Sequence, residues 1–407
     1  MYYYALLFFF FVIAVIFAYF RMKYGFWIHQ PVFHCYDIHY MVFPPGIITH
    51  ELPQKNKYTN FKDITTSIIS HIDKNKRGKF MNIIKSNYLR NGDNVFSPKE
   101  KNVMSYFIGH NHPCFISFYN QEELLNDEQN SQIIEQDKLI GTMTTRPLLV
   151  SIKQDATKAK ENERLDFPVY YADYLCVDKS KRKQGIAPKI IQTHEYNQRH
   201  MNKNVVVSLF KKEDELTGIM PMCIYKTYGF SVDSWRKPTP LIATHSVVEI
   251  GTTNMHLLLD FIKENMNQFD MFIIPETANV VELVKTENIF IHIIISAIKD
   301  RIIAVYFLKK SNTFIERNKE VLSCFGSIQS KDECDDDLFI QGFKIAFWNV
   351  ANQHKFGFAA IERISHNWKL IDNISLKTTA EIVSPSAYFF YNFACPTFNP
   401  ERTLVID

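Results

Sequence analysis

The chain has 407 residues, enough for two domains with a full-sized core, and its 46 basic and 43 acidic residues leave a net charge of +3. This balance argues against a nucleic-acid-binding protein, which would show a strong basic excess. Seven scattered cysteines without a CxxC pair are typical of free thiols in a reducing compartment rather than of a disulfide framework.

Candidate metal ligands are sparse. The sequence has no HExxH motif, and its close sets are His110 with His112 and the group His34, Cys35 and His39. Histidines in loops or in the core explain such spacings better than a metal site does. We therefore expect no metal and no permanently bound cofactor.

Residues 2–20 form an uncharged run, YYYALLFFFFVIAVIFAYF, which Arg21 and Lys23 follow immediately. As a helix this run reaches about 28 Å, the thickness of a hydrocarbon core. We expect residues 1–21 to be a single-pass transmembrane anchor, with residues 2–20 contacting the membrane. The positive-inside rule then places the catalytic part in the cytosol. The alternative is a hydrophobic helix buried in a protein core.

Apolar runs of the β type alternate with helical segments through the rest of the chain, which indicates an α/β protein. We expect strands at 138–152, 169–178 and 204–210, and a helix at 188–201. The segment 218–230 is expected to be a short helix that runs into a turn. Further apolar runs lie at 271–275, 289–310 and 355–362, with a helix around 343–352. The stretches 120–137 and 331–337 are expected to be solvated loops.

Two prolines in the segment 233–240, DSWRKPTP, make it the best candidate for an interdomain linker. The expected division is therefore an anchor at 1–21, an N-terminal half at 22–235 and a C-terminal half at 241–407.

A strand, a basic loop and a helix follow one another around the sequence YLCVDKSKRKQGIAPK, residues 174–189. Unpaired N–H groups at a helix N-terminus attract anions, and a glycine there lets the backbone approach them closely. The loop therefore predicts a pyrophosphate cradle, with a plain basic turn as the alternative. The stretch Arg182, Lys183, Gln184, Gly185, Ile186, Ala187 also resembles the R/Q-x-x-G-x-A pattern of the GNAT acyltransferase superfamily, which holds the pyrophosphate of coenzyme A.

A more specific resemblance covers the chain from Tyr24 to its last residue. YLCVDKSKRKQGIAP is similar to the FLCVHKKLRSKRVAP stretch of N-myristoyltransferases. YGFWIHQPV at 24–32 resembles that family's Y-x-F-W-x-T-Q-P-V, and YFFYNFACPTFNPERTLVID at 388–407 resembles its Y-x-Y-N-W-x-C-P ending. The three stretches occur in the family's order, and weaker similarities lie at 87–96 and 138–147.

The resemblance implies a fold of two GNAT-like halves packed together, α/β (α+β) in class, with acyl-CoA held mainly by the first half. It implies an acyl-CoA co-substrate such as myristoyl-CoA and a protein or peptide with an N-terminal glycine as acceptor. Tyr24, Phe26 and Trp27 are expected to contact acyl-CoA, because aromatic side chains suit an adenine and an acyl tail. Residues 182–187, named above, are expected to bind its phosphates.

The same resemblance implies the catalytic groups. The backbone N–H groups of Tyr174 and Leu175 would polarise the thioester carbonyl, and the α-carboxylate of Asp407 would take the proton of the glycine amine. No acyl-enzyme is needed, so Cys176 is interpreted as a small core residue rather than a nucleophile.

Several departures from the family weaken the prediction of peptide recognition more than that of acyl-CoA binding. His29 replaces a threonine, Arg90 enters a segment that is acidic in the family, and Gly185 stands where many members carry arginine. Residues 218–230 resemble the Tyr-x-x-x-Gly-Phe ending of ordinary GNAT N-acetyltransferases. Two alternatives therefore stay open. One is an N-acetyltransferase for another amine, with Tyr225 or Tyr228 as the acid, and the other is a non-catalytic acyl-CoA-binding membrane protein.

Overall fold

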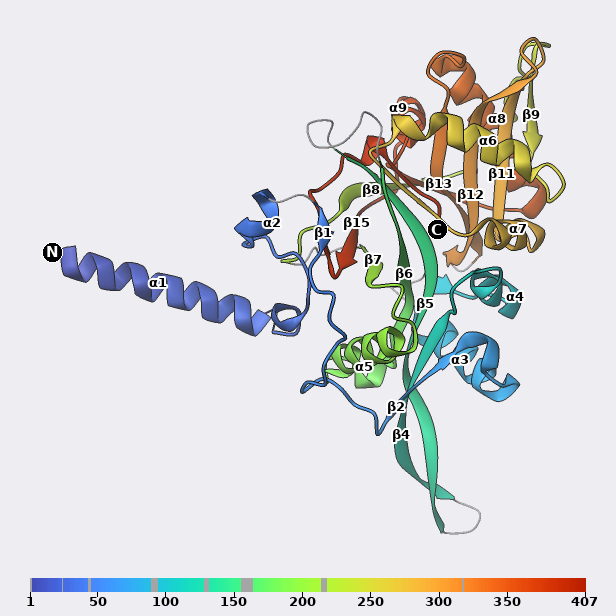
Figure 1. The fold of residues 1–407 in the computed structure, drawn as a ribbon. Coiled ribbons are helices and arrows are strands. Elements are labelled where there is room, and N and C mark those ends of the chain that lie inside the picture. Colours follow the sequence, from blue (N-terminus) through green and yellow to red (C-terminus); the bar gives the residue numbers. More distant parts are fainter. Residues whose placement is uncertain are drawn as a thin grey trace.

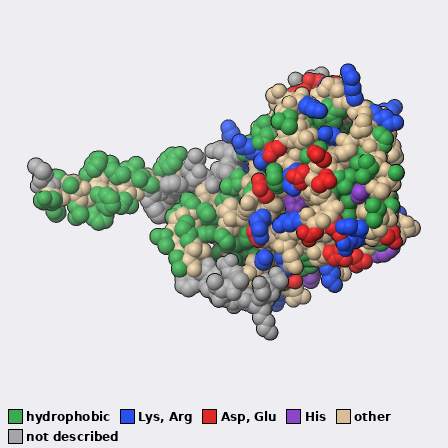
Figure 2. Space-filling model, turned by 90° about the horizontal axis from the view of Figure 1, so that it is seen from above, with side chains coloured by type: hydrophobic (Ala, Val, Ile, Leu, Met, Phe, Trp, Pro, Cys, Tyr) green, Lys and Arg blue, Asp and Glu red, His purple; other side chains and the backbone are tan. Residues whose placement is uncertain are grey.

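The computed structural model describes residues 2–23, 25–42, 45–88, 94–127, 132–154, 164–213, 218–316 and 318–407. Helix α1 (Tyr2–Lys23) projects away from the body of the molecule (Figure 1). Its described side chains are exposed, and hydrophobic groups cover it in Figure 2. Within the described residues, no helix is both long and apolar enough to cross a membrane. The transmembrane anchor expected at 1–21 therefore has no support here.

Seventeen strands lie in the described ranges. In the first part of the chain they are β1 (Gly46–Ile47), β2 (Ile64–Ile68), β3 (Val95–Phe96), β4 (Phe115–Asp127), β5 (Gln132–Lys153), β6 (Arg164–Val177), β7 (Val207–Glu213) and β8 (Cys223–Ser231). In the second part they are β9 (His245–Glu249), β10 (Met271–Ile274), β11 (Ile289–Ser296), β12 (Arg301–Ile315), β13 (Lys319–Gln329), β14 (Phe358–Glu362), β15 (Ile382–Tyr391), β16 (Phe393–Ala394) and β17 (Thr403–Val405).

The α-helices after α1 are shorter. They are α2 (Ile38–Val42), α3 (Lys74–Asn87), α4 (Glu100–Met104), α5 (Ile186–Met201), α6 (Met255–Asn265), α7 (Thr277–Lys285), α8 (Asp336–His354) and α9 (Asn367–Ser375). Single 3-10 turns also occur, among them η3 (Ser105–Phe107) and η4 (Lys179–Lys181).

One sheet crosses the expected linker. Over the described residues its main path runs β17-β10-β5-β6-β7-β15-β8-β14-β13-β12-β11-β9. Strand β15 lies between β7 and β8, and β10 pairs with β5, so strands from both sides of 233–240 are interleaved. The two halves therefore share a sheet. The division of the chain into halves of 22–235 and 241–407 stays a prediction.

Helices cover both faces of the sheet. In the first half, Phe80 of α3 packs with Phe118 of β4, whereas Ile190 of α5 packs with Tyr119, the next residue of that strand. Because successive side chains of a strand point to opposite faces, α3 and α5 lie on opposite sides, as Figure 1 shows. The second half repeats this arrangement: α8 and α9 pack on one face of β12–β14, and α6 and α7 pack on the other.

Most of the expected elements are confirmed. The structure has strands within 138–152, 169–178, 204–210 and 271–275, and the helix expected at 188–201 is α5. The apolar run 289–310 forms the antiparallel pair β11 and β12. The expected loop at 331–337 ends at Asp335, whose side chain accepts a hydrogen bond from the Leu338 amide (2.8 Å) and caps α8.

The expectation of a short helix at 218–230 is wrong, because Cys223–Ser231 is strand β8. Along it Cys223 and Tyr225 are buried while Ile224 and Lys226 are exposed. This period of two is that of a half-buried strand, and β8 pairs with β14 and β15 on its two sides.

The expected solvated loop at 120–137 is also wrong for its described residues. Strands β4 and β5 stay paired from Asn120 opposite Leu139 to Asp127 opposite Gln132, and residues 128–131 lie outside the description. The resulting ribbon projects beyond the helices (Figure 1). The sequence of this segment shows no alternation of apolar and polar residues, so its pattern did not reveal the strands.

Candidate active site

Strands β6 and β7 open away from each other at the centre of the first half. Their parallel pairing runs from Val169 opposite Val207 to Ala172 opposite Phe210, yet β6 continues to Val177 and β7 to Glu213. A gap of this kind exposes backbone and side chains of both strands to a ligand.

Beyond this pairing, β6 bulges away from β5. Thr142 pairs with Cys176 and Thr144 with Asp173, so Tyr174 and Leu175 together oppose one residue of β5. Tyr174 has a positive φ of 48°, which is unusual for a side chain of this size. The Thr144 hydroxyl donates to the Asp173 carbonyl oxygen (3.0 Å) and fixes the bulge. Strain of this kind is often found at functional sites.

The amine cavity, as we name it here, has a volume of about 360 Å³ and lies at this opening. Tyr174 lines it together with residues of β5, β7, β12 and β14 and the last residue of the chain. Its charged lining includes Arg146, Asp173, Lys211, Lys309, Glu362 and Asp407.

The last residue of the chain is buried in this cavity. Strand β17 pairs in parallel with β10, and Asp407 is only 4 % exposed. The Lys309 ammonium lies 2.6 Å from its Oδ1, and the Tyr388 hydroxyl donates to its Oδ2 (3.1 Å). Burial alone would raise the pKa of Asp407, but Lys309, Lys211 and Arg146 outweigh it and hold the pKa well below its usual range.

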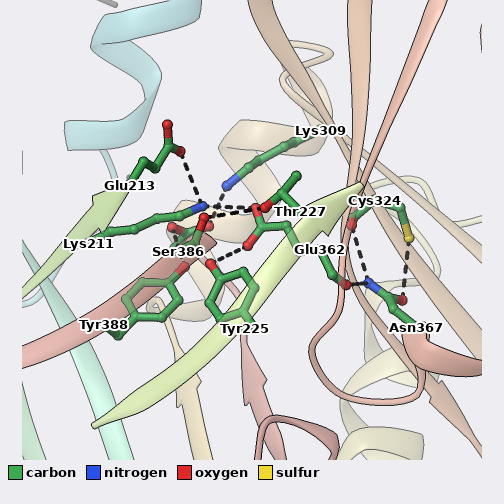
Figure 3. Close-up of polar contacts among 11 residues, drawn as sticks. Lys211, Glu213, Tyr225, Thr227, Lys309, Cys324, Glu362, Asn367, Ser386 and Tyr388 are labelled. Atoms are coloured by element: carbon green, nitrogen blue, oxygen red, sulfur yellow. Dashed lines mark hydrogen bonds and ion pairs between the residues drawn. The ribbon is translucent and has the colours of Figure 1, made fainter. Parts of the chain in front are cut away.

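A second ion pair, of Lys211 with Glu362, lies beside Lys309 (Figure 3). The Lys211 ammonium is 3.1 Å from Oε1 of Glu362, and the Tyr225 hydroxyl donates to Oε2 of the same carboxylate (2.5 Å). Burial and this carboxylate raise the pKa of Tyr225. Tyr225 and Tyr228 are outside the lining that the described residues give to this cavity, so neither is placed as an acid there.

Arg146 is a buried cation in the same lining, at 1 % exposure. Its guanidinium lies 5.1 Å from the ring centres of both Tyr106 and Tyr171. Its Nε and Nη1 are buried without a hydrogen-bond partner among the described residues. Aromatic faces therefore hold this charge in place, close to the carboxylates of the cavity.

The loop cavity, as we name the second space, has a volume of about 620 Å³ and lies at the basic loop. Gly185 caps α5 in the left-handed region (φ 72°), and a Cβ built on it would meet no atom within 4 Å. Arg182 supports the loop by donating to the carbonyl oxygens of Asn87 (2.7 Å) and Val177 (3.3 Å). The N-terminus of α5 therefore faces the loop cavity, and no side chain of Gly185 stands between them.

The two cavities meet at the bulge. Tyr174 lines the amine cavity, the next residue, Leu175, lines the loop cavity, and Tyr88 lines both. The Leu175 side chain is exposed, whereas Tyr174 is buried. The loop cavity and the amine cavity are therefore neighbours, separated by this turn of the backbone.

The structure separates some expected site residues from this pair of cavities. Trp27 stacks on Phe210 and packs with the cluster around Phe389, and Phe26 contacts Trp27 and Tyr58. Neither lines the loop cavity or the amine cavity in the described part of the chain. Tyr24 lies outside the described residues. Gln184 is exposed on the loop, whereas Arg182, Lys183, Gly185, Ile186 and Ala187 line the loop cavity.

Cys176 does not have the environment of a nucleophile. Its thiol is buried beside the Ile83 carbonyl oxygen (3.8 Å), and burial raises the pKa of this thiol to about 12. All seven cysteines are free. The described residues also contain no group of three or more His, Cys, Asp or Glu side chains placed to hold a metal ion.

The sequence reasoning missed five of these six charged residues of the amine cavity: Arg146, Asp173, Lys211, Lys309 and Glu362. They come from five strands that meet only in the folded sheet. A local signal existed for Asp173, which directly precedes Tyr174 and Leu175, and for Arg146, the one charged residue within 139–152.

No protein-family model and no curated protein gives a significant match to the sequence. Solved structures do share its fold. A crystal structure of Saccharomyces cerevisiae N-myristoyltransferase with bound myristoyl-CoA matches with a TM-score of 0.69 and 11% identity, over 92% of this chain and 94% of that one. Another, with myristoyl-CoA and inhibitors, matches with a TM-score of 0.67 and 11% identity, over 93% and 92%.

A tandem GNAT protein from the clavulanic acid biosynthesis pathway gives a TM-score of 0.52 at 10% identity, over 82% of this chain and 100% of that one. At these identities the similarity concerns the fold. The chain is a mixed α/β protein with a large sheet, and its two GNAT-like halves have the arrangement seen in N-myristoyltransferase.

Proposed function

We propose that this protein is an N-acyltransferase that moves a fatty acyl group of the myristoyl type from coenzyme A to the N-terminal glycine amine of a protein. One observation supports this most strongly: the Tyr174–Leu175 bulge lies between two neighbouring cavities. A glycine-containing basic loop lines one of them, and the buried carboxyl terminus lines the other. The shared fold with a yeast enzyme crystallised with myristoyl-CoA is consistent with the same acyl donor.

The loop cavity suits the coenzyme. Its lining combines Lys183 and Gly185 with the first turn of α5, where unpaired N–H groups and the helix dipole favour a pyrophosphate. Leu175, Ile186 and Pro188 give the same cavity an apolar wall. The proposed thioester therefore lies at Leu175, between the phosphates and the amine cavity.

The Leu175 amide is the candidate donor to the thioester oxygen, because the Tyr174 amide already donates to the Asp173 carboxylate (2.7 Å). The substrate ammonium enters the amine cavity, where the α-carboxylate of Asp407 offers an opposite charge. After the ammonium loses a proton, its nitrogen attacks the carbonyl carbon. The C–N bond forms as the C–S bond breaks, and coenzyme A leaves as a thiolate that takes the second proton of that nitrogen.

Product analysis by mass spectrometry tests the proposal. The full chain, purified in detergent, is incubated with peptides that begin with glycine and matched peptides that begin with alanine, each with myristoyl-CoA or acetyl-CoA. We expect a myristoyl group on the glycine amine. Acetylation alone would contradict the proposal in favour of a GNAT N-acetyltransferase. Acyl-CoA binding without any product would contradict it in favour of a non-catalytic binding protein.

We also propose that α1 associates the chain with a membrane, with residues 22–407 in the cytosol, where acyl-CoA is available. The support is the exposed apolar surface of α1. Cell fractionation of the full chain and of a variant without residues 1–23 tests this proposal. Equal distribution of the two forms between membrane and soluble fractions would contradict it, and protection of residues 22–407 from protease in sealed microsomes would reverse the orientation.

A further inference from the structure

A second carboxylate, Asp173, lies directly beside the proposed thioester site. It precedes the Tyr174–Leu175 step and lines the amine cavity. Its Oδ1 accepts hydrogen bonds from the Tyr174 amide (2.7 Å) and from the Tyr88 hydroxyl (3.2 Å). Because both of these bonds from described residues fall on Oδ1, Oδ2 is the oxygen that can receive a substrate group.

We propose that the Asp173 carboxylate accepts the proton of the ammonium group that attacks the thioester, an inference that rests on the acyl transfer proposed above. A base must lie within hydrogen-bond reach of the nitrogen while that nitrogen reaches the reacting carbon. Asp173 fits because a single residue separates it from the Leu175 amide, the candidate donor to the thioester oxygen. The Tyr174 amide and the Tyr88 hydroxyl fix its orientation.

The side chain of Asp407 is a poorer proton acceptor. Both of its oxygens have partners, Lys309 and Tyr388, and nearby cations hold its pKa well below the usual range. At Asp173 burial raises the pKa, although Arg146 and the two hydrogen bonds oppose the shift. A base is most effective when its pKa approaches the working pH. The side chain of Asp407 thus serves as a fixed negative charge for the ammonium. Asp173 takes the proton, a role that the resemblance implied for the α-carboxylate of Asp407.

The charged and titratable groups around Asp173 come from several elements. Arg146 of β5 favours its ionised form, and Asp407 at the chain end disfavours it. Burial raises the pKa of the neighbouring phenols, which keeps them neutral: Tyr88, Tyr106, Tyr171 and Tyr174. The other charged side chains of the cavity are held in ion pairs: Lys211 with Glu362 and Glu213, Lys309 with Asp407, and Lys310 with Glu320. We therefore assign to Asp173 the protonation step that controls the reaction rate at acid pH.

The proton balance closes without a further reactant. The ammonium gives one proton to Oδ2 of Asp173, and the neutral nitrogen attacks the thioester. As the C–S bond breaks, the leaving thiolate takes a second proton from the nitrogen, which gives the amide and coenzyme A as a thiol. Asp173 then returns its proton to water through the emptied cavity.

The test is the dependence of kcat on pH at saturating peptide and myristoyl-CoA. For the full-length protein we expect kcat to fall at acid pH with a midpoint above the ordinary aspartate value of 3.8, because protonated Asp173 cannot accept a proton. Asp173→Asn keeps the acceptor for the Tyr174 amide but removes the base. It should lower kcat by about 100-fold and remove the fall in kcat at acid pH, which we call the acid limb. The affinity for myristoyl-CoA should stay within about threefold. Asp407→Asn, which keeps the α-carboxylate, should retain the limb.

A second variant keeps the inference testable if Asp173→Asn fails to fold. Tyr88→Phe removes the hydroxyl that donates to Asp173 and so destabilises the ionised carboxylate. The acid limb should then move to higher pH by about half a pH unit. A structural role for Asp173 would leave the limb in place.

An unchanged acid limb in both variants, with kcat of Asp173→Asn within about threefold of the parent protein, would overturn the role of Asp173 and leave the acyl transfer intact. A parent protein that acylates no amine would overturn both, so the two failures are distinguishable.

Discussion

The Lys309 ammonium lies 2.6 Å from Oδ1 of Asp407, so the last residue of the chain is tied to the middle of β12. Asp407 is buried and Lys309 is only partly exposed, and Tyr388 holds the other carboxylate oxygen. Removing one member of such a pair leaves a buried charge without compensation, which costs far more than losing an exposed pair.

We therefore predict that Lys309→Met lowers the free energy of unfolding by about 3 kcal/mol. The neighbouring Lys310→Met breaks only the more exposed contact with Glu320 (3.4 Å), and it should cost less than about 1 kcal/mol. The pKa of Asp407 is held below its ordinary 3.8, so the Lys309 effect should persist at neutral pH and shrink only as the pH falls below that value. Urea unfolding of both variants measures this, and equal costs would contradict it.

The second prediction concerns the bulge. The Thr144 hydroxyl donates to the Asp173 carbonyl oxygen, whereas the Thr142 hydroxyl is buried without a partner among the described residues. Thr144→Val should lower kcat by about fivefold, because a loss of about 1 kcal/mol loosens the Tyr174–Leu175 step. Thr142→Val likewise replaces a hydroxyl by a methyl group, and it should leave kcat unchanged. Kinetics with saturating substrates compare the two, and equal effects would mean that this hydrogen bond does not position the site.

The third prediction concerns the basic loop. Gly185→Glu places a negative charge at the N-terminus of α5 and should abolish coenzyme A binding. Gly185→Ala adds only a methyl group in open space, at a cost of about 1 kcal/mol for the positive φ. It should keep affinity within about threefold. Calorimetry with coenzyme A distinguishes them, and binding by the folded Glu variant would contradict a phosphate site in this loop.

The fourth prediction follows from Glu195 in α5. Burial raises the pKa of Glu195 to about 7, from an ordinary 4.5. Since the folded pKa lies above the unfolded one, its contribution to stability is complete below 4.5 and is lost as the pH rises through 7. Relative to Glu195→Gln, the parent protein should lose about 2 kcal/mol between about pH 5 and pH 8.

His194, whose pKa burial lowers to about 4, is present in both proteins and cancels in this difference. Urea unfolding at the two pH values provides the measurement. Parallel stability curves for the two proteins would show that Glu195 is not protonated in the folded state.

The sequence predicted the local elements that border the site, the helix α5 and the chain end, better than the charged residues between them. Helix α5 follows from its apolar period and the preceding glycine, and the buried tail follows from the apolar run before Asp407. The resemblance to N-myristoyltransferases led to the Tyr174–Leu175 step, which the structure places at a bulge. Arg146, Lys211 and Lys309 come together only because β5, β7 and β12 converge, and no local pattern records that convergence.

The wrong assignments have physical causes. In 218–230 the prediction of a helix overlooked the alternation of buried and exposed residues along β8. In 120–137 acidic and amide residues outnumber apolar ones, so no apolar–polar alternation marks the strands. The contact of Phe26 and Trp27 with acyl-CoA, implied by the resemblance, stays a prediction; in the structure Trp27 packs against β7 and β15.

The most direct test of the central claim, that the loop cavity and the amine cavity form one active site, is the binding of a bisubstrate conjugate. In this compound the nitrogen of a glycine-starting peptide is joined through an acyl carbon to the sulfur of coenzyme A. Calorimetry should show that it binds at least about tenfold more tightly than coenzyme A alone, because one molecule fills both cavities. Extending the chain beyond Asp407 by two glycines, which obstructs only the amine cavity, should remove this gain but keep coenzyme A binding. A conjugate that binds no more tightly than coenzyme A would contradict the account.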